Sequence, residues 1–248
     1  QVGETIYRDD AQLNIDQMME EMYATTTASK SACPSPDDYM KSFEGADNII
    51  VVTITGTLSG SYNSAEIAKK IYLEEHPNAK IHVIDSLSAG GEVDLLVRKL
   101  NHLVAEGLEF NQVLDAITAY QAKTKLLFVL AKVDNLVKNG RLSKLVGTVV
   151  GLLNIRMVGE ASKTGTLELL QKARGQKKAI KAAFDELIKA GYTGGHITIA
   201  HRNNDKFIEQ FSELVREKFA HASIEVLPTS GLCSFYAEEG GLLMGYEI

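Results

Sequence analysis

The sequence predicts an α/β protein in which strands and helices alternate from one end of the chain to the other. The first observation is an apolar, β-branched run at residues 49–54, which is typical of a strand buried on both faces of a parallel sheet. The second is that this run leads through a small-residue loop into a helical pattern, and that the same order recurs from residue 80. Further strand patterns alternate with helical ones after residue 124, which is typical of the α/β class.

Two helix starts precede the first strand. Asn14 with Gln17 three residues later resembles a capping box, and the apolar residues that follow recur at helical spacing. Ser35 is expected to be the N-cap of a second helix, with Pro36 as its first residue and Phe43 near its end. The apolar stripe of the first helix is expected to consist of Ile15, Met18, Met19, Met22 and Tyr23.

The loop at residues 56–61, Gly-Thr-Leu-Ser-Gly-Ser, is the strongest candidate for a ligand site. A loop between a strand and a helix can bind an anion, because the first N–H groups of a helix lack intrahelical acceptors and the helix dipole favours negative charge. Gly60 allows a turn that a Cβ atom would hinder, and Ser59 and Ser61 add hydroxyl donors. The helix that follows is expected to bury Ala65, Ile67, Ala68 and Ile71.

The same loop lacks the motifs of nucleotide-binding and hydrolytic sites. It carries no lysine after a glycine, as a Walker loop would, and its two glycines do not have the spacing of a dinucleotide-binding fingerprint. Ser59 also lacks the glycine frame of a nucleophile elbow. Spacing alone leaves a second interpretation open, in which Ser61 or Asn63 caps the helix and Ser59 faces only water.

A second strand, loop and helix follow the first. Residues 80–85 predict a strand, residues 86–91 a small-residue loop that begins with Ser86, and residues 93–104 a helix. Loops at the carboxyl ends of neighbouring parallel strands share one crevice, so a ligand site built from both loops is expected. Asp85 ends the second strand, where a catalytic role and a loop-capping role are both open.

We place the boundary between two domains after residue 123. This gives an N-terminal parallel-sheet α/β domain at 1–123 and a C-terminal α/β domain at 124–248. The expected elements around and after the boundary are helices at 110–120, 177–188 and 207–219, and strands at 125–131, 167–170, 196–200, 224–227 and 242–248.

An apolar segment at residues 142–153 would have no polar face if it formed a helix. Such a helix is either buried on all sides or lines an apolar cavity, and ordinary burial between domains would also account for it. If the segment walls an apolar tunnel, the residues expected to line that tunnel are Leu145, Val149, Val150 and Leu153.

The composition is that of an ordinary globular protein, with 45% hydrophobic and 23% charged residues among 248 and a net charge of −6. Because no basic cluster stands out, nucleic-acid binding is not expected. Cys33 and Cys233 are expected to be reduced thiols. No apolar run approaches membrane-spanning length and no signal peptide is recognisable, so we expect a cytoplasmic protein.

The sequence shows no recognisable set of catalytic or metal-binding residues. Its six histidines do not have metal-ligand spacing with one another, with cysteine or with a carboxylate, so no metal or other cofactor is expected. A hydrolase would need a nucleophile, a base and an orienting group together, and the sequence does not fix such a set.

Five short motifs resemble those of the DegV family and occur in the same order. Each motif is weak alone, but the ordered set spans almost the whole chain. The chain therefore resembles a DegV-type protein and is similar to the fatty-acid-binding subunits of bacterial fatty acid kinase. The motifs are Ser-Ala-Cys-Pro-Ser-Pro at 31–36, Leu-Ser-Gly-Ser-Tyr at 58–62, Asp85-Ser86 with its small-residue loop, Asn-Gly-Arg-Leu-Ser at 139–143 and Leu-Asn-Ile at 153–155.

This resemblance implies two α/β domains with a long-chain fatty acid bound between them. The hydroxyls of Ser31 and Ser59 would hold the carboxylate of the fatty acid, and Gly60 and Ser61 would offer backbone N–H groups. Arg141 would lie near the mouth of the site. The resemblance also implies a fatty acid kinase catalytic subunit as partner, and it leaves room for transient contact with a membrane surface.

The chain departs from the family pattern at several points. The family's first strand, with its Asp-Ser-Thr signature, is absent, so we expect that N-terminal sequence is missing. Cys33 stands where the family has glutamine. The histidine that often completes the carboxylate site is missing from residues 234–241, where Tyr236 is the candidate replacement. Ser86 is a further candidate for contact with the ligand.

Sequence and resemblance together predict a protein that binds a long-chain fatty acid, catalyses no reaction itself and presents the fatty acid to a kinase. The alternative is a phosphotransferase or hydrolase that uses the loop at 56–61 to hold a phosphate. A nucleotide-binding motif would favour the alternative, and we recognise none in the sequence.

Overall fold

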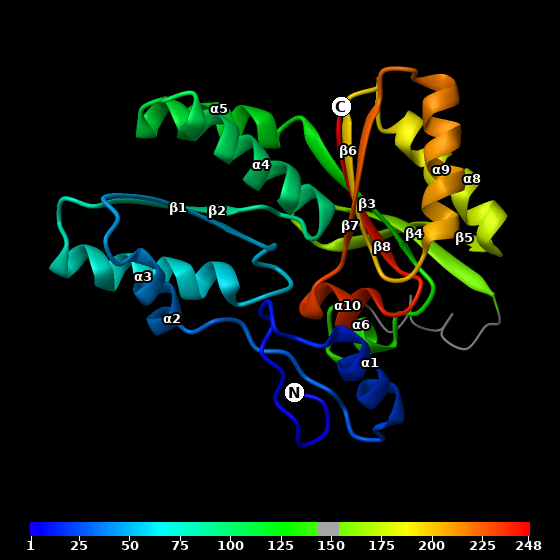
Figure 1. The fold of residues 1–248 in the computed structure, drawn as a ribbon, viewed down its shortest axis with the longest axis horizontal. Coiled ribbons are helices and arrows are strands. Elements are labelled where there is room, and N and C mark those ends of the chain that lie inside the picture. The colour runs from blue at the N-terminus through cyan, green and yellow to red at the C-terminus, as the bar shows by residue number, and fades with distance from the viewer. Residues whose placement is uncertain (143–153) are drawn as a thin grey trace.

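The computed structural model describes residues 1–142 and 154–248, and these residues form two β-sheets with helices around them (Figure 1). The smaller sheet has two strands in the order β1-β2, and the larger has six in the order β5-β4-β3-β8-β6-β7. Helices alternate with strands along the chain. The α/β class predicted from the sequence is therefore confirmed.

The smaller sheet consists of β1 (Asn48–Thr53) and β2 (Lys80–Asp85), which pair in parallel. Ile49 of β1 packs in the core on one face of this sheet, whereas Ile50 packs with Ile84 in the core on the other face. Successive side chains of a strand point to opposite faces, so two cores are expected wherever helices cover both faces. The apolar runs of the sequence reflect this burial on both sides.

Two pairs of helices cover the smaller sheet, one pair on each face (Figure 1). The helices of the first pair come before and after β1 in the sequence, and the second pair follows β2 and leads into the larger sheet. The pairs are α2 (Pro36–Phe43) with α3 (Ser61–Glu75), and α4 (Gly91–Ala105) with α5 (Phe110–Gln121).

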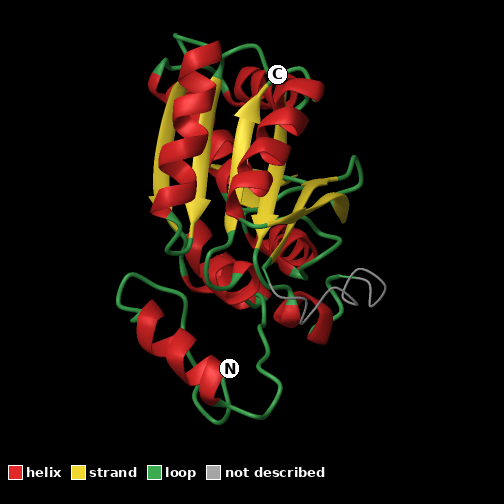
Figure 2. Cartoon of the chain, turned by 90° about the vertical axis from the view of Figure 1, so that its right-hand side faces the viewer, coloured by secondary structure: helices red, strands yellow, loops and turns green. Residues whose placement is uncertain are grey.

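In the larger sheet, β6 and β7 are parallel and the other neighbouring pairs are antiparallel. Two helices, α8 (Gln176–Lys189) and α9 (Asp205–Lys218), cover one face of it (Figure 2). They bury Phe207 and Phe211 against the strands. The strands are β3 (Thr124–Leu130), β4 (Ile155–Ala161), β5 (Leu167–Arg174), β6 (His196–His201), β7 (Ser223–Pro228) and β8 (Leu242–Glu247).

The other face of the larger sheet meets the N-terminus of α4. A Cβ atom added to Gly91 would lie 2.2 Å from the carbonyl oxygen of Thr198 and 2.6 Å from the backbone nitrogen of Gly245. Only glycine permits so close an approach of helix to sheet. Helix α4 thus packs against both sheets. The division of the chain into two domains after residue 123 stays a prediction.

Three short helices gather beyond one end of the larger sheet (Figure 1). They are α1 (Ile15–Ala24), α6 (Asp134–Lys138) and α10 (Gly231–Ala237). Met18, Met19 and Met22 of α1 pack against Phe235 of α10, so the methionines fill a core as their helical spacing predicts.

The two helix starts predicted before the first strand are confirmed. Asn14 accepts a hydrogen bond from the backbone nitrogen of Gln17 at 3.1 Å. Ser35 and Asp38 form a reciprocal capping box, and Pro36 is the first residue of α2.

The predicted apolar stripe of α3 is only half correct. Ala65 and Ala68 are fully buried, but Ile67 and Ile71 are 39% and 41% exposed. The buried face of α3 instead includes serines and Tyr72, whose hydroxyl donates to the carbonyl oxygen of Phe43. An apolar pattern finds only the two alanines of this face, since the other buried residues are two serines and a tyrosine.

Candidate functional site

A cavity of about 1100 Å³ lies between the loop at residues 56–61 and the larger sheet. Its walls are mostly apolar, and they come from both halves of the chain. The size is at the upper end of the range for small-molecule sites, which are concave, apolar and equipped with a few polar groups. The apolar side chains that wall it include Phe128, Leu130, Leu136, Leu167 and Leu243.

Ser59, Gly60 and Ser61 line this cavity where α3 begins. The hydroxyl oxygens of Ser59 and Ser61 are 2.9 Å apart, and the backbone nitrogen of Ser61 donates to Ser59 Oγ at 3.2 Å. Gly60 is the N-cap residue and has no side chain to cap the helix, and neither Ser61 nor Asn63 is in the N-cap position. The alternative in which Ser61 or Asn63 caps the helix is therefore wrong.

Ser31 and Tyr236 add a second pair of hydroxyls to the same cavity. Their oxygens are 2.7 Å apart, although the residues are separated by 205 positions in the sequence. Tyr236 belongs to α10, and its ring lies 5.8 Å from the guanidinium carbon of Arg141. The structure thus brings the candidates Ser31, Arg141 and Tyr236 together.

The side chain of Arg141 is held by backbone oxygens. Its Nε donates to the carbonyl oxygen of Leu58 at 3.1 Å, and its Nη1 donates to that of Asn139 at 2.7 Å. The first bond ties Arg141 to the loop that carries Ser59. The guanidinium therefore brings positive charge to the polar end of the cavity.

Ser86 does not line this cavity. It is 2% exposed, and its hydroxyl donates to the carbonyl oxygen of Ser88 at 3.1 Å. From the loop that follows β2, Ala89 reaches the cavity instead. The side chain of Ser86 turns inward and closes its own turn. That Ser86 contacts a ligand stays a prediction.

Asp85 caps the loop at residues 56–61. Its carboxylate accepts from the backbone nitrogen of Gly56 at 3.1 Å and from that of Leu87 at 2.9 Å. Of the two roles left open by the sequence, the structure shows loop capping. This carboxylate holds the two neighbouring loops together beside the cavity.

The predicted tunnel residues Leu145, Val149, Val150 and Leu153 lie outside the residues that the structure describes. The described apolar walls are provided by other residues, chiefly from the larger sheet and α10. The assignment of these four residues to a tunnel stays a prediction.

The sequence analysis missed several residues that line the cavity, among them Asp9, Tyr39 and Cys233. Burial raises the pKa of Tyr39, and its hydrogen bond with Ser61 lowers that pKa in part. Burial raises the pKa of Cys233 to about 11, so at neutral pH the thiol is protonated and serves as an apolar wall. In the sequence, only the short separation of Cys33 and Tyr39 from Ser31 could have indicated that these two residues line the cavity.

The described residues offer no cluster of three or more metal-ligating side chains. None of the helices described here is both long and apolar enough to span a membrane.

The cavity and its serines can be compared with known proteins. The model of a family of uncharacterised proteins, the DegV family COG1307, matches residues 1–246. The chain belongs to the DegV family. It is 76% identical over 248 residues to a DegV domain-containing protein of Streptococcus gordonii, and the match covers all of this chain and 88% of that protein.

Two solved structures of this family resemble the fold closely. The first is the Streptococcus pneumoniae fatty acid kinase (Fak) B3 protein loaded with linoleic acid, with a TM-score of 0.98 and 75% identity over all of this chain and 88% of that one. The second is a DegV family protein from Eubacterium eligens loaded with heptadecanoic acid, with a TM-score of 0.93 and 39% identity over 96% of this chain and 87% of that one.

Proposed function

We propose that this DegV protein binds a long-chain fatty acid, with the carboxylate at Ser31, Ser59, Gly60 and Ser61 and the acyl chain in the apolar cavity. The observation that carries the proposal is the gathering of serine hydroxyls and a helix N-terminus in one cavity that is otherwise walled by apolar side chains. Similar proteins loaded with linoleic acid and heptadecanoic acid support the choice of ligand.

The acyl chain supplies most of the affinity in this proposal. Burial of each CH₂ group contributes about 0.8 kcal/mol, so a long chain gains more from an apolar cavity than from a few hydrogen bonds. The hydroxyls at the polar end fix the orientation of the ligand and disfavour lipids whose head group carries no anion.

Tyr236 takes over the hydrogen-bonding role of the histidine that the family pattern places near the C-terminus. A phenol can donate one hydrogen bond to a carboxylate, as a histidine can. The Tyr236 hydroxyl lies 2.7 Å from that of Ser31, which is one of the residues proposed to bind the carboxylate. Arg141, whose guanidinium carbon lies 5.8 Å from the centre of the Tyr236 ring, would add a favourable positive charge.

The protein would act as a carrier that presents its fatty acid to a separate kinase subunit in the cytoplasm. The similarity to a fatty acid kinase B3 protein supports this partner. Transient contact with a membrane surface would allow exchange of the lipid. Catalysis by the chain itself is not part of the proposal.

The test is a titration of delipidated protein with linoleate and with its methyl ester, together with native mass spectrometry of the protein as purified. We expect saturable binding of the free acid, weak binding of the ester and a mass increment that matches a bound fatty acid. Absence of binding by correctly folded protein would overturn the proposal.

A further inference from the structure

The N-terminal loop and the last helix of the chain are joined by one carboxylate. Asp9 Oδ1 accepts from the backbone nitrogen of Gly231 at 2.7 Å, and Asp9 Oδ2 accepts from that of Leu232 at 2.8 Å. A Cβ atom added to Gly231 would lie 2.8 Å from Asp9 Oδ1 and 2.4 Å from Leu13 Cδ2. Glycine is therefore needed for α10 to begin this close to Asp9.

The other end of α10 is held by Asn135 of α6. Asn135 Nδ2 donates to the carbonyl oxygen of Phe235 at 2.8 Å, and the backbone nitrogen of Asn135 donates to Glu238 Oε1 at 3.1 Å. Tyr236 lies between Phe235 and Glu238 in the sequence, so residues on both sides of it are bonded to Asn135. The N-terminal attachment is the one that comes from the cavity wall, since Asp9 lines the cavity.

We propose that Asp9 is a positioning residue for the carboxylate site, and that it acts by fixing α10 so that the Tyr236 hydroxyl stays beside Ser31. This inference rests on the proposed binding of a fatty acid. A carboxylate in the wall of a cavity would ordinarily repel an anionic ligand. Here both oxygens of Asp9 accept backbone hydrogen bonds, which direct the carboxylate toward α10.

A positioning role and a merely structural role differ in what they do to ligand selectivity. If Asp9 only stabilises the fold, its removal weakens binding of the free acid and of the methyl ester alike. If Asp9 acts through Tyr236, its removal weakens binding of the free acid selectively, because only the anion depends on the hydroxyl.

The experiment measures the affinities for linoleate and methyl linoleate in Asp9→Ala and Asp9→Asn, each alone and combined with Tyr236→Phe. We expect Asp9→Ala to lower the acid-to-ester affinity ratio by roughly three-fold and by no more than Tyr236→Phe does, and Asp9→Asn, which keeps one acceptor oxygen, to lower it less. In the Tyr236→Phe background, both changes should leave the ratio unaltered. Such non-additivity is the signature of two residues that act as a unit.

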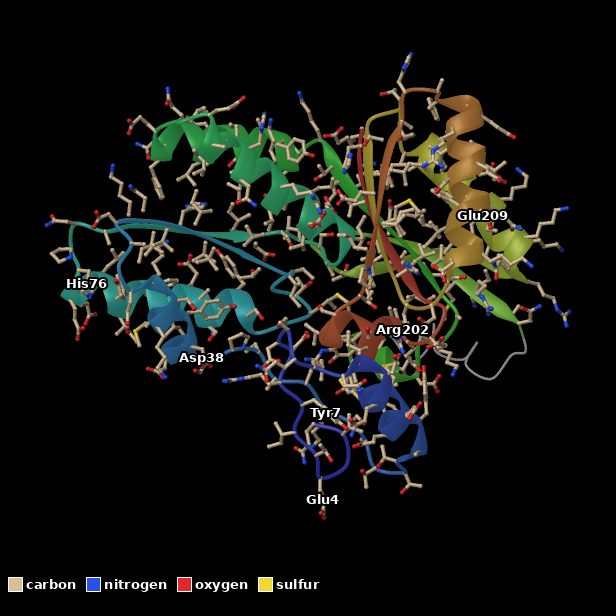
Figure 3. The ribbon with its side chains drawn as sticks, in the orientation of Figure 1. Glu4, Tyr7, Asp38, His76, Arg202 and Glu209 are labelled. Atoms are coloured by element: carbon tan, nitrogen blue, oxygen red, sulfur yellow. The ribbon has the colours of Figure 1, made fainter. Side chains whose placement is uncertain are left out.

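Asp16→Ala is the matched control. Asp16 also ties the N-terminal segment to the C-terminal half, through Arg202, which Figure 3 shows close to α1 and α10, but it bonds to neither Gly231 nor Leu232. This control should lower stability without changing the acid-to-ester ratio.

Two outcomes would overturn the positioning role: an unchanged ratio in folded Asp9→Ala and Asp9→Asn, or the same drop in ratio with and without the Tyr236 hydroxyl. Circular dichroism of each variant establishes that it is folded. Failure of the wild-type protein to bind linoleate would instead overturn the proposed function, and the positioning role with it.

Discussion

The hydroxyl oxygens of Ser31 and Tyr236 lie 2.7 Å apart inside the cavity. Each hydroxyl has one hydrogen to donate, and when one of them donates to the other, the acceptor's own hydrogen stays free. A carboxylate placed beside the pair can accept that hydrogen. The contact therefore leaves one hydroxyl hydrogen available, which is what the proposed carboxylate site requires.

Tyr236→Phe should weaken binding of a free fatty acid by roughly three- to ten-fold, the value expected for loss of one modest hydrogen bond. The phenyl ring stays in place, so the edge-on contact with Phe235 is preserved. Isothermal titration with linoleate measures the change. Tyr23→Phe is the control, since its hydroxyl bonds to the backbone of Glu239 and does not line the cavity. Equal affinities for wild type and Tyr236→Phe would remove Tyr236 from the site.

Incubation of the protein with ATP and a fatty acid should yield no acyl phosphate unless a kinase is added. The sequence contains no Walker loop. It also identifies no general base that would activate the hydroxyl of Ser59 or of its neighbours. Trapping of acyl phosphate with hydroxylamine gives the measurement. Steady turnover by the protein alone would favour the phosphotransferase alternative over the carrier.

The local parts of this site could be predicted from the sequence because neighbouring residues determine them. Ser59, Gly60 and Ser61 follow a strand and precede a helix, and the chain itself places them at a helix N-terminus. The capping box of Ser35 and Asp38 is local in the same way. Each of these features needs only a few consecutive residues.

Features that depend on distant contacts could not be predicted in this way. The bonds from Gly231 and Leu232 to Asp9 join residues more than two hundred positions apart, and nothing in either motif specifies the other. The resemblance to a known family named Tyr236 as a candidate, but only the fold shows that it meets Ser31.

Glu92→Gln should change how stability depends on pH. Burial raises the pKa of Glu92 above its ordinary value of 4.5, although hydrogen bonds and the charge of Lys125 offset part of the shift. The folded protein therefore holds this proton to higher pH than the unfolded chain does. The stabilisation is fully present below about pH 4.5 and is lost as the pH rises through the raised pKa.

Because glutamine does not titrate, the unfolding free energy of Glu92→Gln relative to wild type should increase as the pH rises through that window. The amide oxygen can still accept the hydrogen bond that Thr124 donates at 2.8 Å. Urea unfolding at a series of pH values measures the difference between the two proteins. A difference that stays constant with pH would show that Glu92 does not titrate in this window.

Ser59→Ala should weaken binding of a free fatty acid by about ten- to a hundred-fold. The reason is that a hydrogen bond to a charged group contributes roughly 1.5–3 kcal/mol and about 1.4 kcal/mol corresponds to a factor of ten. Ser59 Oγ also accepts from the backbone nitrogen of Ser61, so its loss disturbs two of the proposed carboxylate contacts. Affinity for the methyl ester should be poor in wild type and nearly insensitive to the change, because the ester carries no anion.

Thr57→Ala is the control in the same loop. It leaves the serines unchanged, since Thr57 Oγ1 donates to the carbonyl oxygen of Gly165. If Ser59→Ala binds the free acid as tightly as wild type, Ser59 only shapes the loop and the carboxylate lies elsewhere in the cavity.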